Sequence, residues 1–199
     1  MTQWGFYFNQ ARCLGCATCT VACKEWNEGR RGDAKFNTLT ANQLESMATP
    51  EDWIAGKKNE SINHDFLRHF HMKETWRKVS FFEFGDVAPN VAVVPLSLSC
   101  NHCSDPACVK VCPTKAHYKR AEDGLVVIDR DKCIGCGMCA QACPYGAPQL
   151  DEKARKMMKC DGCLDRLEKG GAPICVEACP QRAISFGEIS ELRRTFGTL

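Results

Sequence analysis

Short runs of aromatic and β-branched residues predict strands, and cysteine-rich loops lie between them. Apolar residues at 6–8 precede the first cysteines, residues 126–128 precede a later set, and residues 184–186 follow the last one. The dipeptide Asp123-Gly124 is a strong hairpin signal, so we expect residues 126–128 to pair with residues 117–119. Each cysteine loop should then lead into a helix of one or two turns that follows the third cysteine of its group.

Residues 28–95 have a different pattern. The stretches 78–84 and 91–98 are rich in strand formers, and they predict a hairpin that returns the chain to Cys100. Thr49 and Pro50, followed by two acidic residues, are typical of a helix start, and a second helix is expected near 65–76. A terminal helix is expected near 190–196. No motif in 28–95 indicates chemistry, so we assign this segment to packing and partner contact.

The sixteen cysteines fall into four groups of four. The groups are Cys13, Cys16, Cys19 and Cys23; Cys100, Cys103, Cys108 and Cys112; Cys133, Cys136, Cys139 and Cys143; and Cys160, Cys163, Cys175 and Cys179. The first and third have the spacing C-x2-C-x2-C-x3-C, and all but the first end in Cys-Pro, which stops a helix. In bacterial ferredoxins, three cysteines of such a run hold one iron–sulfur cluster and the fourth reaches a second cluster.

This exchange predicts how the groups combine. The adjacent second and third groups should form one pair, and the first and fourth groups should form the other. Cluster A would be held by Cys13, Cys16, Cys19 and Cys179; cluster B by Cys23, Cys160, Cys163 and Cys175; cluster C by Cys100, Cys103, Cys108 and Cys143; and cluster D by Cys112, Cys133, Cys136 and Cys139. Lys24 replaces the proline in the first group, so its helix should continue to residue 27.

The expected fold is α+β, with two tandem ferredoxin-like modules that each hold two [4Fe–4S] clusters. One module comprises residues 1–27 and 150–199, the other comprises 96–149, and the insert of about 65 residues covers 28–95. The formal net charge is +2. Four clusters of about −2 each would bring it to roughly −6, so the basic side chains offset buried anions. Without its metal the chain should fold poorly.

Other interpretations of the cysteines fit less well. A disulfide scaffold would need selective pairing within closely spaced triplets, and no secretory signal indicates an oxidising compartment. A zinc knuckle has no use for the third cysteine of a triplet. The bases are spread along the chain without any nucleic-acid-binding signature, and no apolar run is long enough to span a membrane. His102 could donate a hydrogen bond to a cluster sulfur and raise its potential, or it could be structural.

Seven sequence motifs resemble the four-cluster iron–sulfur subunits of the dimethyl sulfoxide reductase family of molybdopterin oxidoreductases. The resemblance covers residues 1–30 and 95–197. It is carried by Gly5-Phe6, the run from Cys13 to Lys24, Ser99-Cys100-Asn101-His102-Cys103, Asp105-Pro106-Ala107-Cys108, Ala142-Cys143-Pro144-Tyr145-Gly146-Ala147-Pro148-Gln149, Lys159-Cys160-Asp161-Gly162-Cys163 and Pro173-Ile174-Cys175-Val176-Glu177. The insert matches less well.

The resemblance implies an electron-transfer subunit that is not an enzyme by itself. Clusters A and B would lie toward a molybdopterin catalytic subunit with molybdenum or tungsten, and clusters C and D toward a membrane quinone-handling subunit. Nitrate-reductase-like relatives have tryptophan at the position of Cys136 and a three-iron cluster there, so Cys136 predicts four [4Fe–4S] clusters. The subunit would be peripheral to the cytoplasmic membrane, on the outer face if it is exported with its partner.

Two alternatives stay open at this point. One is a soluble polyferredoxin-like carrier, and the other is an electron-transfer subunit of a hydrogenase or formate-lyase complex. No phosphate-binding glycine loop and no pair of catalytic carboxylates occurs in the sequence, so the clusters are expected to move electrons only.

Overall fold

The computed structural model describes residues 2–28, 75–85 and 90–197. These parts of the chain mix helices with strands, as the α+β prediction requires. The helices expected near residue 49 and near 65–76 lie outside the described residues, except for Thr75 and Trp76, and neither of these two is helical. The described strands form four antiparallel sheets of two strands each.

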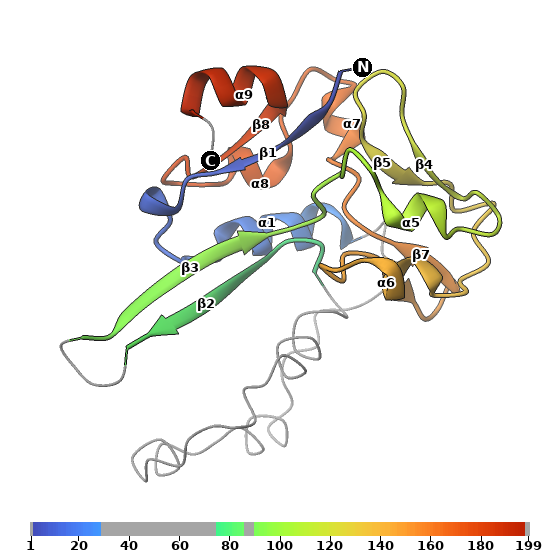
Figure 1. Ribbon diagram of the computed structural model, residues 1–199, viewed down its shortest axis with the longest axis horizontal. Helices are drawn as coiled ribbons and strands as arrows, with labels where there is room; N and C mark the ends of the chain where they lie inside the picture. Colours follow the sequence, from blue (N-terminus) through green and yellow to red (C-terminus); the bar gives the residue numbers. More distant parts are fainter. Residues whose placement is uncertain (1, 29–74, 86–89, 198–199) are drawn as a thin grey trace, which may run out of the picture.

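The two ends of the chain meet in one of these sheets. Strand β1 (Trp4–Phe8) pairs with β8 (Ile184–Glu188), and Phe6 lies opposite Phe186. Helix α9 (Ile189–Phe196) follows directly and lies over this sheet (Figure 1). The terminal helix therefore begins one residue before the predicted start. This pairing brings the first cysteine group beside the fourth, although they are far apart in sequence.

The helices of the cysteine groups pack in the same pairs. Helix α1 (Thr18–Trp26) contacts α8 (Ile174–Glu177), and α5 (Ala107–Lys110) contacts α6 (Met138–Ala142). Helix α1 continues past Cys23, and Asn27 is its C-cap, as the absence of a proline predicts. The first group thus neighbours the fourth, and the second neighbours the third.

All four helices begin one residue before the third cysteine, which corrects the prediction that they follow it. The N-cap lies two residues before that cysteine in each group, and it differs between the pairs. Ala17 and Gly137 have left-handed backbones, with φ of 57° and 78°, whereas Pro106 and Pro173 are extended. Either conformation turns the chain out of the preceding loop, so the third cysteine lies in the first helical turn.

Two further hairpins lie on the side of the second and third groups. Strands β4 (His117–Lys119) and β5 (Val126–Ile128) pair as predicted, with Gly124 at a φ of 71° in the turn. The sequence did not predict the hairpin of β6 (Gln149–Asp151) and β7 (Lys156–Met158). Its turn is held by the Asp151 carboxylate, which accepts hydrogen bonds from backbone N–H groups.

The hairpin of β2 (Lys78–Phe84) and β3 (Ala92–Leu98) extends from the body of the molecule (Figure 1). Its inner end packs against the first cysteine loop. A Cβ on Gly15 would lie 2.6 Å from the Phe81 ring, and Gly15 has a φ of 71°, so a larger residue there would strain the backbone and displace the ring. The segment before Cys13 is the short 3-10 helix η1 (Gln10–Arg12), and α7 (Leu164–Leu167) occupies the long step between Cys163 and Cys175.

Candidate metal centre

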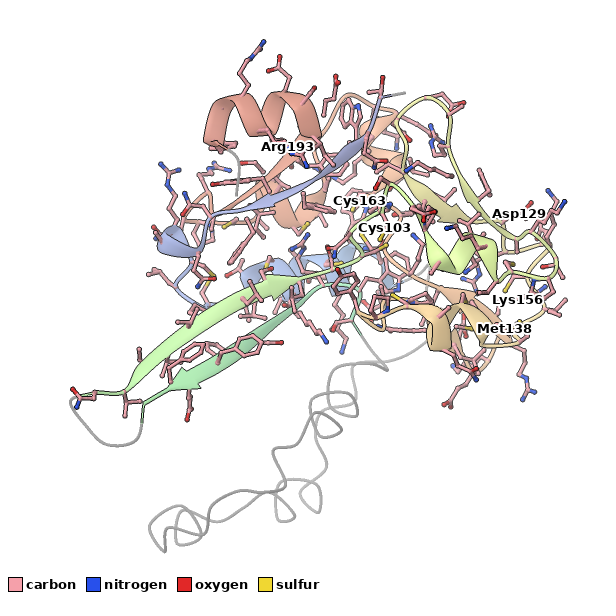
Figure 2. All side chains as sticks on the ribbon, in the orientation of Figure 1. Cys103, Asp129, Met138, Lys156, Cys163 and Arg193 are labelled. Atoms are coloured by element: carbon pink, nitrogen blue, oxygen red, sulfur yellow. The ribbon has the colours of Figure 1, made fainter. Side chains whose placement is uncertain are left out.

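All sixteen cysteines are free thiols. Most lie in the interior, and Figure 2 shows the labelled Cys103 and Cys163 in the middle of the molecule, away from Arg193 on α9. Nine are buried, five are half-buried, and only Cys16 and Cys136 are exposed. These two are the second cysteines of the two matching groups. The structure therefore holds its thiols internally without cross-linking them, and one thiol at each matching group faces outward.

The four thiols expected for cluster A line a single recess. Cys13, Cys16 and Cys19 come from the first loop and the start of α1, and Cys179 comes from the end of the fourth group. Phe8, Val79 and Ile184 form part of its apolar wall. A set of soft thiolate donors around an apolar recess fits an iron–sulfur cluster by its chemistry.

The other three predicted sets are also brought together. Burial is the main cause of the raised pKa of Cys160 and Cys163, and the nearby negative charges of Cys23 and Cys175 add to it. Cys100 and Cys143 act in the same way on Cys103 and Cys108. Cys133 and Cys136 do so on Cys139, and Cys112 packs against the same core. Thiols of neighbouring sets are close as well, since Cys100 also acts on Cys160 and Cys108 also acts on Cys139.

The sets form a row in space. Cys19 packs with Cys175 in one buried core, which joins the sets for clusters A and B. A second core joins B to C, since it contains Cys160 and Cys100. A third joins C to D, since Cys108 packs against Cys139. Thiols expected for four clusters are therefore contiguous from one end of the row to the other.

Backbone and side-chain donors point at several of these sulfurs. The N–H of Ala183 donates to Cys179 Sγ at 3.2 Å, and the N–H of Ala147 donates to Cys143 Sγ at 3.5 Å. Both donors lie four residues after the last cysteine of a group. Thr18 Oγ1 donates to Cys16 Sγ at 3.3 Å. Such hydrogen bonds favour a thiolate over a thiol, as a metal ligand requires.

Burial opposes ionisation of the thiols when no metal is bound. It raises the pKa of Cys139 and Cys163 to about 12 and that of Cys160 well above its usual value. Because metal ligands must be deprotonated, binding of iron at these sites releases protons, and a higher pH favours it.

The comparison with known proteins identifies iron–sulfur domains in this chain. Residues 91–189 match the family described as "4Fe-4S dicluster domain", and residues 10–26 match "4Fe-4S binding domain". The iron–sulfur subunit of the anaerobic dimethyl sulfoxide reductase of Escherichia coli is 44% identical over 198 residues, which cover 100% of this chain and 80% of the relative.

This protein belongs to the family of iron–sulfur electron-transfer subunits that includes the one from anaerobic dimethyl sulfoxide reductase. Subunits with other partners are also similar to it. A subunit of the sulfite dehydrogenase of Allochromatium vinosum is 37% identical, over 96% of this chain and 71% of the relative. The beta subunit of the perchlorate reductase of Dechloromonas aromatica is 35% identical, over 90% and 63%.

The sequence did not reveal two buried cations beside the thiols of this family member. Arg77 is 2% exposed and Lys159 is 4% exposed. Lys159 Nζ donates to the backbone oxygens of Val126 and Cys160. Its place next to Cys160 in the sequence is a signal that could have drawn attention to it. Arg77 stands 23 residues before Cys100 and beside no cysteine, so it has no such signal.

His102 is fully buried, and its surroundings determine the protonation state of its ring. Its Nδ1 accepts a hydrogen bond from the N–H of Val126 at 3.0 Å. Burial, helped by the nearby Lys159 charge, lowers the pKa of His102 well below its usual value. The ring is therefore neutral, and its proton lies on Nε2, which has no partner among the described residues. This orphaned donor fits the first of the two roles that the sequence left open for His102, a hydrogen bond to a cluster sulfur.

Among the described residues, no three histidine, cysteine or acidic side chains are close enough to form a site for a single metal ion. Nor does any helix in that part of the chain have the length and apolar character to cross a membrane.

Proposed function

We propose that this chain is a non-catalytic subunit that relays electrons through four [4Fe–4S] clusters. The ligand sets are those predicted for clusters A to D from the cysteine spacing. The observation that carries the proposal is the row of thiol sets, in which each buried core joins one set to the next. The clusters supply one-electron redox chemistry when bound. The chain's own residues hold them, exclude water and donate hydrogen bonds to sulfur.

The proposed architecture has two ferredoxin-like modules. Residues 1–27 with 150–199 would hold clusters A and B, and residues 96–149 would hold C and D. Support comes from the pairing of β1 with β8 and from the contact between α5 and α6. Residues 28–95 would be an insert, and the inner end of its β2–β3 hairpin would complete the wall of the cluster A site through Val79.

The exposed cysteines mark where electrons would enter and leave. Cys16 belongs to the set for cluster A and Cys136 to the set for cluster D, at opposite ends of the row. An exposed apolar side chain stands two residues before each of them in the sequence: Leu14, 71% exposed, before Cys16, and Ile134, 63% exposed, before Cys136. Exposed apolar surface of this kind is typical of protein–protein contact sites.

The proposed partners are a molybdopterin catalytic subunit at the A and B end and a membrane quinone-handling subunit at the C and D end. The similar proteins include subunits of reductases for dimethyl sulfoxide and perchlorate and of a sulfite dehydrogenase. Electrons would pass from D through C and B to A in a reductase and in the reverse order in a dehydrogenase. The chain would then be peripheral to the cytoplasmic membrane.

Anaerobic purification from the native membrane, through an affinity tag on this chain, tests the proposal. We expect a molybdopterin-containing subunit to co-purify, and we expect its substrate and a quinol to exchange electrons with the clusters. Cys179→Ser is the matched control, since it should remove cluster A and interrupt the exchange while the complex stays assembled. A stable soluble monomer without partners would contradict this proposal and favour a polyferredoxin-like carrier.

A further inference from the structure

Arg77 is a buried cation in the described part of the chain. It precedes strand β2, and only 2% of its surface is exposed. No carboxylate among residues 2–28, 75–85 and 90–197 lies within ion-pair distance of it. A buried charge is costly unless anions or hydrogen-bond acceptors surround it, so the partners of Arg77 must lie elsewhere.

Three side chains hold the Arg77 guanidinium in place. Its Nη1 donates to Ser97 Oγ at 3.0 Å, and its Nη2 donates to Ser99 Oγ at 2.8 Å. The guanidinium also lies over the Phe6 ring, 4.5 Å from the ring centre. Both hydroxyls and the ring come from strands or strand ends, so the charge has a fixed position.

This position faces cysteines of two predicted clusters. Ser97 Oγ, which holds Arg77, is 3.4 Å from Cys19 Sγ. Phe6 packs against both the core that contains Cys19 and the core that contains Cys160. The contacts of Arg77 therefore place it where the thiols for clusters A and B meet.

The electrostatics agree with this geometry. Cys175, Cys160, Cys19 and Cys23 all lie near enough to the Arg77 guanidinium to interact with it electrostatically. Sulfurs expected for both clusters therefore lie around the charge, where a carboxylate would otherwise be expected.

We propose that Arg77 sets the reduction potentials of clusters A and B by fixing a positive charge between them. The inference rests on the proposed electron-transfer function. One-electron reduction changes a four-thiolate cluster from about −2 to about −3, with the electron coming from the partner subunit. A buried positive charge stabilises the more negative form, so it raises the potential. The arginine side chain stays protonated and takes no proton from the step.

The test is a redox titration of the whole complex, monitored by electron paramagnetic resonance. The variants are Arg77→Gln, Arg77→Lys and, as a matched loss of an exposed charge on α9, Arg193→Gln. At a fixed ambient potential, the ratio of reduced to oxidised cluster should be at least tenfold lower in Arg77→Gln than in the wild type, for both cluster A and cluster B. For a one-electron couple this corresponds to a fall of about 59 mV or more. Cluster D, which has no predicted ligand near Arg77, should titrate as in the wild type.

The conservative variant separates charge from packing. Arg77→Lys keeps the charge, so A and B should stay within threefold of the wild-type ratio. If Arg77→Gln does not retain its clusters, the test rests on Arg77→Lys alone. A tenfold fall in the ratio of reduced to oxidised cluster in Arg77→Lys, where the charge is kept, would overturn the inference. Unchanged potentials in a fully loaded Arg77→Gln would also overturn it, as would an equal shift in Arg193→Gln. Iron and spectra of the wild type are measured first, so missing clusters there would instead reject the proposed function.

Discussion

The two halves of the row of thiols differ in burial and in sequence separation. We call the first and fourth cysteine groups the one-four region, and the second and third groups the two-three region. Six of the eight thiols in the one-four region are buried, but only three of eight in the two-three region: Cys100, Cys133 and Cys139. Arg77 and the inner end of the β2–β3 hairpin also lie against the one-four region.

The difference indicates how each region is held together. The two-three region comes from one continuous stretch, residues 100–143, with a hairpin of its own between the groups. The one-four region joins segments from opposite ends of the chain, and closing such long loops has a larger entropic cost. Deep burial and a fixed cation suit a region whose metal sites must hold distant segments together.

Iron removal should have the largest effect, and it should separate the two regions. Anaerobic chelation removes what we expect to be most of the folding free energy, about 5–15 kcal/mol for a domain. Hydrogen exchange should show nearly complete loss of protection in β1 and β8. The β4–β5 hairpin has local contacts and the buried Leu125, so it should keep more protection. Equal protection of both sheets in the iron-free protein would contradict the comparison.

Replacing the fourth cysteine of a group should have the next largest effect. The cluster lost should be the one whose other three ligands belong to a different group. Cys179→Ser should abolish cluster A, whose other ligands are in the first group, and leave C and D intact. Cys112→Ser is the matched change in the two-three region and should disturb only cluster D. Mössbauer and electron paramagnetic resonance spectra of both variants check this. Loss of a cluster held by the variant's own group would refute the exchange of ligands.

The exposed second cysteines should give smaller, matched effects. Cys136→Ser should convert cluster D to a three-iron form, because the ligand lost is the one nearest to solvent, and the other clusters should stay assembled. Cys16→Ser should do the same to cluster A. Iron analysis should fall by about one atom per chain in each variant, one corner of a four-iron cluster. An unchanged resonance spectrum would count against these ligand assignments.

The smallest effect concerns the N-caps of α1 and α6. Both Ala17 and Gly137 have positive φ, and a Cβ on Gly137 would meet no atom within 4 Å. Gly137→Ala should therefore destabilise the protein by about 1 kcal/mol through backbone strain alone, and Ala17→Gly should stabilise it by a similar amount. Midpoints of unfolding in denaturant, measured on the loaded protein, check both. Shifts of the same sign would contradict the comparison.

The local parts of the fold could be predicted from the sequence. Strands at 117–119 and 126–128 were predicted to the residue, because Asp123-Gly124 sets the turn and the apolar residues set the register. The continuation of α1 to Trp26 followed from Lys24 in place of proline. The β6–β7 hairpin was missed because its strands have three residues each and its turn depends on side-chain contacts of Asp151.

The kind of site could be predicted from the sequence, but its electrostatics could not. Cysteine spacing predicts iron–sulfur clusters, and it predicts that the fourth cysteine of a group serves a second cluster. Nothing in the sequence marks Arg77 as buried, because its position depends on Ser97 and Ser99 at the end of β3 and on Phe6 in β1, two segments far from each other in the sequence. The orphaned Nε2 of His102 likewise depends on the N–H of Val126 in β5.

Iron and inorganic sulfide content, with Mössbauer spectra of anaerobically prepared protein, tests the central claim most directly. The claim is that four interlocked thiol sets hold four [4Fe–4S] clusters. The account predicts about sixteen irons and sixteen sulfides per chain, four of each for every cluster, in one class of cubane spectra. Iron well below that value, zinc in its place, or compact and cooperative folding of colourless, iron-free protein would contradict it.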